Sequence, residues 1–199
     1  MIYLASNYNK SLLDKYGVEY LYHMTHIDNL SSMIKYGLYA HGNGYQSKDI
    51  SDHDVNDRRS LQEPIYHLPI HSYVPFYLNP KNAMLYRRRN IQDKIVILGI
   101  NRDLIFSKQA IFTDGNAACQ STKFYNNISD IKNLDWDCLH AERWSDIFDG
   151  RRTRMAEVLI PDHVSVNEIE VVFCNDIWLK SRIENMTTIS VKQTNEFYF

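Results

Sequence analysis

Short apolar runs separated by polar stretches predict a domain built mainly from strands. The runs are rich in β-branched and aromatic residues, and a length of about four to six residues is typical of buried strands. They lie at residues 19–24, 73–78, 95–100, 110–113, 155–160 and 168–173. We expect each run to form one strand.

One amphipathic helix is expected directly after the first strand. The segment IDNLSSMIKYG repeats apolar residues at steps of three and four, which places Ile27, Leu30 and Ile34 on one face. Thr25 is expected to open this helix, with the acid three positions later as its capping-box partner. Gly37 is well placed to end it.

Two polar stretches interrupt the pattern. Residues 41–63 are rich in Asp, Asn, Ser and Gly, and a long polar loop in a compact domain is more often functional or mobile than incidental. Residues 114–135 are expected to be part loop and part helix, followed by a short helix in 134–144. No GxGxxG follows a strand and no GxxxxGK[ST] is present. The order of elements predicts a mixed α+β domain rather than βαβ units.

The composition fits a single globular domain over residues 1–199, with 44% hydrophobic and 23% charged residues. No stretch approaches the roughly 18 apolar residues of a membrane span, and the N-terminus lacks the layout of a signal peptide. We therefore expect a cytoplasmic protein without membrane contact. Three cysteines without CxxC spacing and eight scattered histidines predict neither a disulfide framework nor a metal site.

The net charge of −2 argues against a protein held to nucleic acid by bulk electrostatics. Local basic runs remain at residues 58–59, 87–89 and 151–154. Such runs are usually solvated surface. Tyr86 precedes the second run, and the chain contains 14 Tyr, 8 Phe and 3 Trp that can stack on bases. Most of these aromatics are expected to be core, so composition alone gives only a weak signal for nucleic-acid binding.

His23 and Thr25 lie at the junction of the first strand and the first helix. A neutral imidazole offers one donor and one acceptor, and residues two apart point to the same side of a strand. The pair is suited to holding a ribose hydroxyl or a carboxamide. It is also compatible with a buried histidine that satisfies backbone groups and a threonine that caps the helix.

Glu157 is a carboxylate within an apolar strand, where alternation places it on the face of Met155 and Leu159. A buried carboxylate is costly unless it is paired or used. It is suited to stabilising the positive charge that develops on a sugar when a glycosidic bond breaks. The alternative is a glutamate on an edge strand, paired with a neighbouring arginine.

Three further segments contain candidate chemistry. Arg58 and Arg59 of the polar loop are able to bind a pyrophosphate or to restrain a carboxylate. Tyr77, in PFYLNP, is an aromatic at a strand end that can stack on nicotinamide, with ordinary core packing as the alternative. The segment TDGNAA at 113–118 is a turn signature without unique chemistry.

Taken in order, these segments resemble the DarT family of DNA ADP-ribosyltransferase toxins. The matching pieces are YHMTHIDNLSSMIKYGL, the DRR of the polar loop, HSYVPFYLNPKNAMLY, FTDGNAA and RRTRMAEVLIP. Each motif is weak alone, but five in the same order are specific, and they lie between residues 20 and 176. The resemblance implies an ADP-ribosyltransferase fold with a split β-sheet core and peripheral helices, which binds NAD⁺ between its two sheets.

By position, the resemblance implies that Glu157 is the catalytic glutamate and that Arg58 or Arg59 is the catalytic loop arginine. The residues that it assigns to NAD⁺ binding are His23, Thr25, Asn29 and Tyr77. NAD⁺ is expected as a co-substrate, and no metal is expected.

The implied reaction is cleavage of NAD⁺ and transfer of ADP-ribose to a base of single-stranded DNA, with release of nicotinamide. For such a substrate, the polar segment 41–63 and the basic runs at 87–89 and 151–154 are the candidates for the DNA path. A macrodomain antitoxin that removes the mark is the expected partner of such a toxin. The segment SLQEPIYHLPI departs from the Gly/Pro-rich linker of thymine-modifying members, so both thymine and guanine stay open as the target. An ADP-ribosyltransferase that acts on RNA, protein or a small molecule is the alternative. A non-catalytic nucleic-acid-binding module and a nuclease are more distant alternatives.

Overall fold

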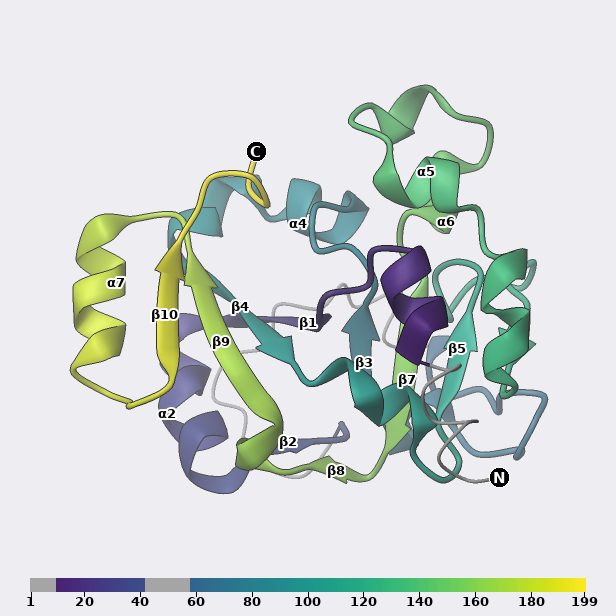
Figure 1. The fold of residues 1–199 in the computed structure, drawn as a ribbon, viewed down its shortest axis with the longest axis horizontal. Coiled ribbons are helices and arrows are strands. Elements are labelled where there is room, and N and C mark those ends of the chain that lie inside the picture. Colours follow the sequence, from purple (N-terminus) through teal and green to yellow (C-terminus); the bar gives the residue numbers. More distant parts are fainter. Residues whose placement is uncertain (1–9, 42–57) are drawn as a thin grey trace.

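The computed structural model describes residues 10–41 and 58–199 of the chain (Figure 1). Within them the strands are β1 (Leu21–His26), β2 (Leu38–Tyr39), β3 (Tyr73–Tyr77), β4 (Ile95–Ile100), β5 (Ile111–Thr113), β6 (Phe124–Tyr125), β7 (Glu157–Pro161), β8 (His163–Val164), β9 (Ile169–Cys174) and β10 (Ser190–Gln193). The α-helices are α2 (Ile27–Tyr36), α4 (Ala83–Arg87), α5 (Trp136–His140), α6 (Gly150–Thr153) and α7 (Ile177–Glu184), and residues 10–15 are also helical. Short 3₁₀ helices are η1 (Ile70–Ser72), η2 (Arg89–Lys94), η3 (Arg102–Phe106), η4 (Ile128–Asn133), η5 (Trp144–Asp146) and η6 (Val166–Glu168).

A large sheet with the order β10-β9-β4-β1-β3-β7-β5-β6 forms the centre of the described chain, and β2 pairs with β8 beside it. Its neighbouring strands are antiparallel apart from β9 and β10, which are parallel. Antiparallel strands with helices around them confirm the predicted α+β class.

The large sheet is split between β1 and β3. β1 pairs with β4 along its whole length, whereas it meets β3 only where Tyr22 lies opposite Tyr77. Beyond that pair a side chain bridges the two strands, because His23 Nδ1 lies 2.9 Å from the carbonyl oxygen of Pro75. The split core is therefore present as two halves joined by a single backbone pair.

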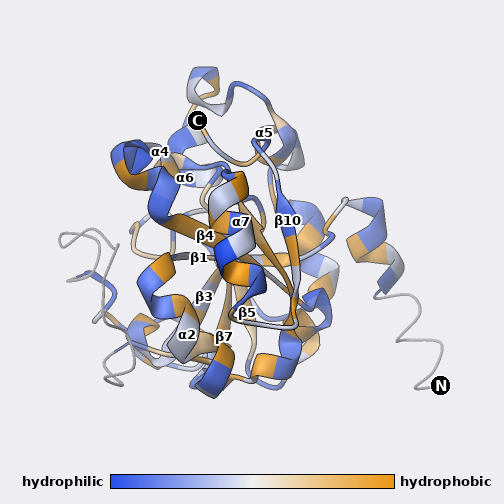
Figure 2. Ribbon diagram, turned by 90° about the vertical axis from the view of Figure 1, so that its left-hand side faces the viewer, coloured by the Kyte–Doolittle hydropathy of each residue, from blue (hydrophilic) through white to orange (hydrophobic). Residues whose placement is uncertain are grey.

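The main hydrophobic core covers one face of both halves. Leu30 of α2 and Ile183 of α7 are fully buried there against strand residues such as Leu98 and Val158. Figure 2 shows the central strands coloured mainly as hydrophobic and the surrounding helices as mixed. Burying each large apolar side chain contributes about 1.5–3 kcal/mol, which is what fixes the helices to the sheet.

The opposite face carries two smaller clusters. Over the β1–β4 half, Leu85 of α4 and Tyr198 pack on strand residues that include Tyr22. Over the β3–β7 half, residues 65–73 pack on a cluster that includes Leu159. Glu157 lies on the same face of the sheet as Leu159. It is therefore close to the boundary between these two clusters.

The boundary between β1 and α2 differs from the prediction. β1 continues through Thr25 to His26, because these residues pair with Val96 and Ile95 of β4. His26 then caps α2, with its Nδ1 accepting the second helical N–H at 3.2 Å. The expectation that Thr25 opens the helix is wrong, whereas Gly37 ends the helix as expected, with φ of 84°.

β7 begins at Glu157 rather than at Met155. The residues before it form a turn in which the N–H groups of Met155 and Ala156 donate to the carbonyls of Arg152 and Thr153. β4 has its predicted bounds, and those of β3, β5 and β9 are shifted by one residue. The sequence did not predict the strands β2, β6, β8 and β10, the helices α4, α6 and α7, or the helix at residues 10–15.

Candidate active site

Glu157 occupies the centre of the candidate site, fully buried at the start of β7. β7 lies between β3 and β5, so the edge-strand part of the alternative is wrong, whereas the pairing with an arginine that it expected is present. Arg59 donates two parallel hydrogen bonds to it, from Nη1 to Oε1 at 3.2 Å and from Nη2 to Oε2 at 2.9 Å. Arg58 is exposed. Of the two candidate arginines, Arg59 is the one that meets the carboxylate.

A backbone amide adds a third hydrogen bond to Glu157, since the N–H of Ala117 donates to Oε1 at 2.9 Å. The hydroxyl of Thr113 accepts the backbone N–H of Glu157 at 3.0 Å and donates to the carbonyl of Gly115 at 2.7 Å. Sequence reasoning identified 113–118 only as a turn. The contact depends on β5 pairing beside β7, and no local signal reveals that pairing.

Burial strengthens the interaction between Arg59 and Glu157. Burial by itself lowers the pKa of Arg59, but the charge and hydrogen bonds of Glu157 outweigh it and raise that pKa overall. Tyr77 lies opposite Glu157 in the register of β3 and β7. Burial, followed by the charge of Glu157, raises the pKa of the Tyr77 hydroxyl. An ion pair and a neutral phenol therefore lie side by side in a site of low polarity.

Arg152 stabilises the turn that carries Ala117. Its Nη1 donates to Asp114 Oδ1 at 2.7 Å and its Nε to Asp149 Oδ2 at 2.6 Å. Gly115 lies against this guanidinium, since a β-carbon there would be 2.3 Å from Arg152 Nη1. The turn and the arginine therefore pack as one unit.

Arg154 is also internal, with 4% of its surface exposed. Its guanidinium donates to four carbonyl oxygens at 2.5 to 3.0 Å, those of Lys81, Cys138, Leu139 and Ala141. Burial lowers its pKa to about 10. The expectation of a DNA path along 151–154 does not hold for Arg152 and Arg154, whose donors bind the protein itself, whereas Arg151 is exposed. Most of the other candidate segment, residues 42–57, lies outside the described residues.

His23 stands on the other half of the split sheet. A carbonyl oxygen only accepts, so the contact with Pro75 puts the proton on Nδ1 and leaves Nε2 as an acceptor in the neutral ring. Burial lowers the pKa of His23 more strongly than the bond to Pro75 raises it. The ring is therefore neutral at pH 7, and it presents a single acceptor suited to a hydroxyl or amide N–H.

Thr25 and Asn29 contact each other. Asn29 Nδ2 donates to Thr25 Oγ1 at 3.0 Å, and both residues are 2% exposed. The bond ties β1 to α2. The predicted site residues thus fall into two groups, with His23, Thr25 and Asn29 at the β1–α2 junction. Arg59, Tyr77 and Glu157 form the second group, beside β3 and β7.

A buried carboxylate that sequence reasoning missed organises the segment after Arg59. Glu63 is 1% exposed and accepts hydrogen bonds at 2.7 to 3.1 Å from the N–H groups of Ile65, Tyr66 and Leu68 and from the hydroxyl of Tyr73. Burial raises the pKa of Glu63, but these donors outweigh it and the pKa is lowered. The carboxylate is therefore ionised and holds residues 63–73 against the sheet.

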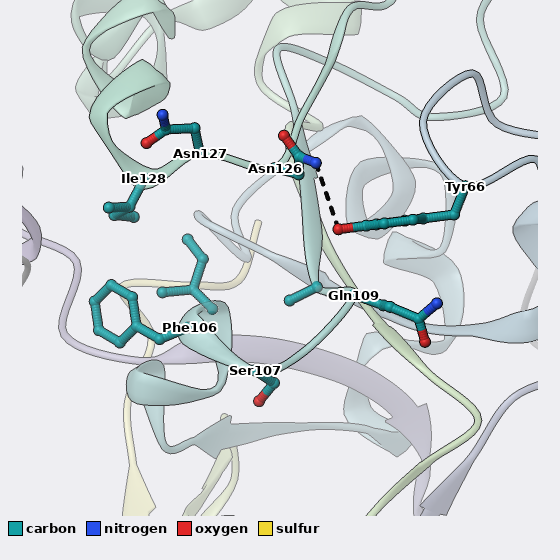
Figure 3. A pocket seen from close by; sticks show the side chains of 9 residues that line it. Tyr66, Phe106, Ser107, Gln109, Asn126, Asn127 and Ile128 are labelled. Carbon is teal, nitrogen blue, oxygen red and sulfur yellow. Dashed lines mark hydrogen bonds between the residues drawn. The ribbon is translucent and has the colours of Figure 1, made fainter.

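A pocket of about 420 Å³ opens at the far end of β5, away from Thr113 (Figure 3). Tyr66 and Asn126 meet at one side of it, where Asn126 Nδ2 lies 3.4 Å from the Tyr66 hydroxyl. Phe106 and Ile128 line the other side, and none of the lining residues is charged. The pocket is separate from the group around Glu157.

Over residues 10–41 and 58–199, no three side chains of His, Cys, Asp or Glu converge in a way that would hold a metal ion. None of the helices in these ranges has both the length and the apolar character needed to cross a bilayer.

Comparison with known proteins gives a family model that matches residues 22–199, described as "ssDNA thymidine ADP-ribosyltransferase, DarT". The chain is similar to the DNA ADP-ribosyl transferase of Thermus sp. (strain 2.9), at 29% identity over 160 residues, covering 70% of this chain and 73% of that protein. It is also similar to the DNA ADP-ribosyl transferase-DNA ADP-ribosyl glycohydrolase fusion protein of Thermosipho africanus, at 27% identity over 191 residues. That match covers 90% of this chain, which spans about half of the fusion protein (49%).

Solved structures show the same fold. Thermus sp. 2.9 DarT in complex with ADP-ribosylated ssDNA superimposes with a TM-score of 0.85 at 22% identity, over 92% of this chain and 97% of that one. The same Thermus protein in complex with NAD⁺ gives a TM-score of 0.80 at 22% identity, over 90% of this chain and 96% of that one.

Proposed function

The chain belongs to the DarT family of single-stranded DNA thymidine ADP-ribosyltransferases, and on this premise we propose that it cleaves NAD⁺ and transfers ADP-ribose to a thymine base of single-stranded DNA. Nicotinamide is the leaving group. The observation that carries the proposal is the buried carboxylate of Glu157, fixed by Arg59 within the matched region. The family description favours thymine over guanine as the target base.

Glu157 stabilises the charge that develops during the reaction. When the bond between nicotinamide and ribose breaks, its electron pair leaves with nicotinamide and the ribose becomes positively charged. Oε1 of Glu157 accepts two hydrogen bonds and Oε2 accepts one, so Oε2 has capacity left for a substrate group. Arg59 acts as a positioning residue that keeps this oxygen oriented. Because Glu157 is fully buried, substrates reach it only after side chains above it move.

Thymine supplies the nucleophile. In thymidine N1 is bonded to deoxyribose, so N3 is the remaining ring nitrogen. As N3 attacks the ribose carbon, the new N–C bond forms and the N3 proton leaves, and Oε2 of Glu157 accepts it. In a duplex N3 is paired with adenine, whereas an unpaired base costs least to place in the site. This explains a preference for single strands.

His23, Thr25, Asn29 and Tyr77 form the NAD⁺ site. Nε2 of His23 accepts a hydrogen bond from a hydroxyl or from the carboxamide of NAD⁺. The bond between Thr25 and Asn29 keeps the end of β1 in place beside it. Tyr77 presents a ring next to Glu157, which suits stacking on nicotinamide. The likeness to a Thermus protein solved with NAD⁺ supports NAD⁺ as the co-substrate.

A glycohydrolase is the proposed partner. The Thermosipho africanus relative joins a DNA ADP-ribosyl transferase to a DNA ADP-ribosyl glycohydrolase in one protein. Hydrolysis of the new N-glycosidic bond would restore the base. The chain would then be the toxin of a toxin–antitoxin pair, with a glycohydrolase of the macrodomain type as the antitoxin.

The test is incubation of the protein with labelled NAD⁺ and separate pools of single-stranded DNA, duplex DNA, RNA and protein. The label is expected on single-stranded DNA, and mass spectrometry should place it on oligonucleotides that contain thymine. Replacing thymine by N3-methylthymine should abolish labelling, because N3 is blocked. Labelling of RNA or protein with none on DNA would overturn the proposal.

A further inference from the structure

Two aromatic rings in contact, with a cation against each of them, lie between α4 and the last described residue. The guanidinium of Arg89 is 4.5 Å from the centre of the Tyr86 ring, which meets the Phe199 ring edge-on at 5.1 Å. Lys81 Nζ is 5.5 Å from the centre of the Phe199 ring. We call these four residues the cation–aromatic ladder. Tyr86 is 45% exposed and Phe199 is 42% exposed, so both rings offer surface to a ligand.

Contacts with the protein hold the ladder in a fixed arrangement. Arg89 Nη1 donates to the carbonyl of Tyr86 at 3.2 Å, and the N–H of Phe199 donates to Gln92 Oε1 at 2.9 Å. The preceding residue, Tyr198, is buried, and its hydroxyl binds backbone carbonyls of β4 and β9. A fixed aromatic surface loses little conformational entropy when a ligand stacks on it.

The segment that contains Lys81, Tyr86 and Arg89 of the ladder has a high local positive charge. Residues 81–94 contain five cations (Lys81, Arg87, Arg88, Arg89 and Lys94) and one acid (Asp93), a net charge of +4 in a chain whose total is −2. Such a local field attracts a polyanion even when the whole protein is slightly acidic. Exposed aromatic rings beside cations are typical of surfaces that bind single strands.

The ladder is joined to the candidate active site. Lys81 follows Tyr77 by four residues, and its carbonyl accepts a hydrogen bond from Arg154, three residues before Glu157. In Figure 1, α4 and the C-terminal end lie at the same upper edge of the sheet as α6, which leads into β7. A strand bound in the site is therefore able to extend onto the ladder.

We propose that the cation–aromatic ladder is a stacking platform for unpaired bases that flank the modified base, with its cations bound to the intervening phosphates. This inference rests on the proposed function, because it takes single-stranded DNA as the substrate. The platform binds strands without reading their sequence, since every base has a face that can stack on Tyr86 or Phe199. Duplex DNA hides these faces.

The test compares the variants Tyr86→Ala and Arg89→Gln on a thymine-containing 20-mer and on thymidine 5′-monophosphate, which has no flanking bases to stack. On the 20-mer, Tyr86→Ala should raise KM about 10-fold with kcat unchanged, and Arg89→Gln should lower the slope of log KM against log salt by about 0.7. On the mononucleotide both variants should match the unaltered protein. Tyr86→Phe keeps the stacking ring, and Lys192→Gln removes an exposed cation on β10, so both should leave KM within about 2-fold.

Three outcomes would overturn this inference. An unchanged KM on the 20-mer, or an equal rise in KM on both substrates, would show that the ladder is not a stacking platform even though the enzyme modifies DNA. Normal DNA modification together with lost binding to a purified DNA ADP-ribosyl glycohydrolase would make the ladder a protein interface. Absence of DNA modification by the unaltered protein would instead overturn the proposed function.

Discussion

Arg59 and Glu157, 98 residues apart in the chain, meet inside the protein through two parallel hydrogen bonds of 3.2 and 2.9 Å. Glu157 is fully buried and the Arg59 side chain is 13% exposed, so each charge depends on the other for its solvation. Pairing by a planar guanidinium fixes the rotation of the carboxylate as well as its position. The proposed chemistry therefore relies on a residue from the segment before β3 to orient a residue of β7.

Arg59→Ala should destabilise the protein and abolish transfer. Removing one partner of a buried pair leaves an uncompensated charge, which costs about 3–5 kcal/mol of unfolding free energy. Arg59→Lys keeps the charge but cannot make both bonds, so its transfer rate should fall about 100-fold or more. Urea unfolding and the rate of nicotinamide release measure the two effects.

The matched control is exposed Arg58, where Arg58→Ala should change stability by less than about 0.5 kcal/mol. Equal damage from the two alanine variants would contradict the assignment.

Gly115→Ala should disturb the turn that presents the Ala117 amide to Glu157. The added β-carbon would lie 2.3 Å from Arg152 Nη1, and Arg152 cannot retreat without losing its bonds to Asp114 and Asp149. We expect a loss of about 1–3 kcal/mol in unfolding free energy and slower transfer. A double-mutant cycle with Arg152→Ala provides the control, because removing the guanidinium should reduce the cost of Gly115→Ala. A cost that is the same in both backgrounds would exclude this clash as the cause.

NAD⁺ binding should be insensitive to pH around neutrality. The pKa of His23 is lowered below its ordinary value of about 6.5, so Nε2 remains an acceptor as the pH falls through that value. Affinity should weaken only at lower pH, once the ring is protonated. As the pH falls, His23 is protonated in the unfolded chain at a higher pH than in the folded protein. The contribution of His23 to the free energy of unfolding is therefore lost as pH falls from about 6.5 through the lowered pKa. Calorimetric titration with NAD⁺ from pH 8 to 5 measures the affinity, with His23→Gln as the reference without a titrating group. A Kd that already rises between pH 8 and 7 speaks against a neutral His23.

Glu63→Gln should loosen the segment that follows Arg59. The carboxylate accepts hydrogen bonds from three backbone N–H groups and from Tyr73, whereas an amide would turn a donor toward some of them. The expected loss is about 1–3 kcal/mol in unfolding free energy. Because the pKa of Glu63 is lowered, its contribution is present above its ordinary pKa and is lost as pH falls through the lowered value. Urea unfolding at pH 7 and pH 3 tests both points, with exposed Glu142→Gln as control. A variant as stable as the unaltered protein at pH 7 would refute this role.

Local patterns were sufficient for the elements with strong periodicity. β4 is an uninterrupted apolar run that is buried at every position. On the predicted face of α2, Ile27 and Leu30 are buried and Ile34 is partly buried against the core, with Met33 buried beside them. β10 has only Val191 buried among exposed residues, and β2, β6 and β8 are two residues long. Such strands exist because a neighbouring strand is in place, which a single segment does not reveal.

In the candidate site too, some features could be predicted from the local sequence and others depend on tertiary packing. The need of Glu157 for a partner could be predicted, because a carboxylate flanked by apolar residues in the sequence is costly to bury alone. The choice of Arg59 over Arg58 and the contact with the Ala117 amide depend on tertiary packing across β5 and β7. Glu63 gave no sign in the sequence, since its role depends on a turn that closes around it. The capping role given to Thr25 failed because strand pairing extends β1 to His26.

The most direct test of the account is the mass change of a thymine-containing single-stranded oligonucleotide after reaction with NAD⁺ and the variant Glu157→Gln. Glutamine keeps the shape of the side chain but removes the charge that stabilises the ribose and accepts the N3 proton. The variant should bind NAD⁺ within a few-fold of the unaltered protein, and its transfer should fall by about 10²–10³ or more. Glu170→Gln, exposed on β9, should transfer at the normal rate. Full transfer of ADP-ribose by Glu157→Gln would contradict the central claim.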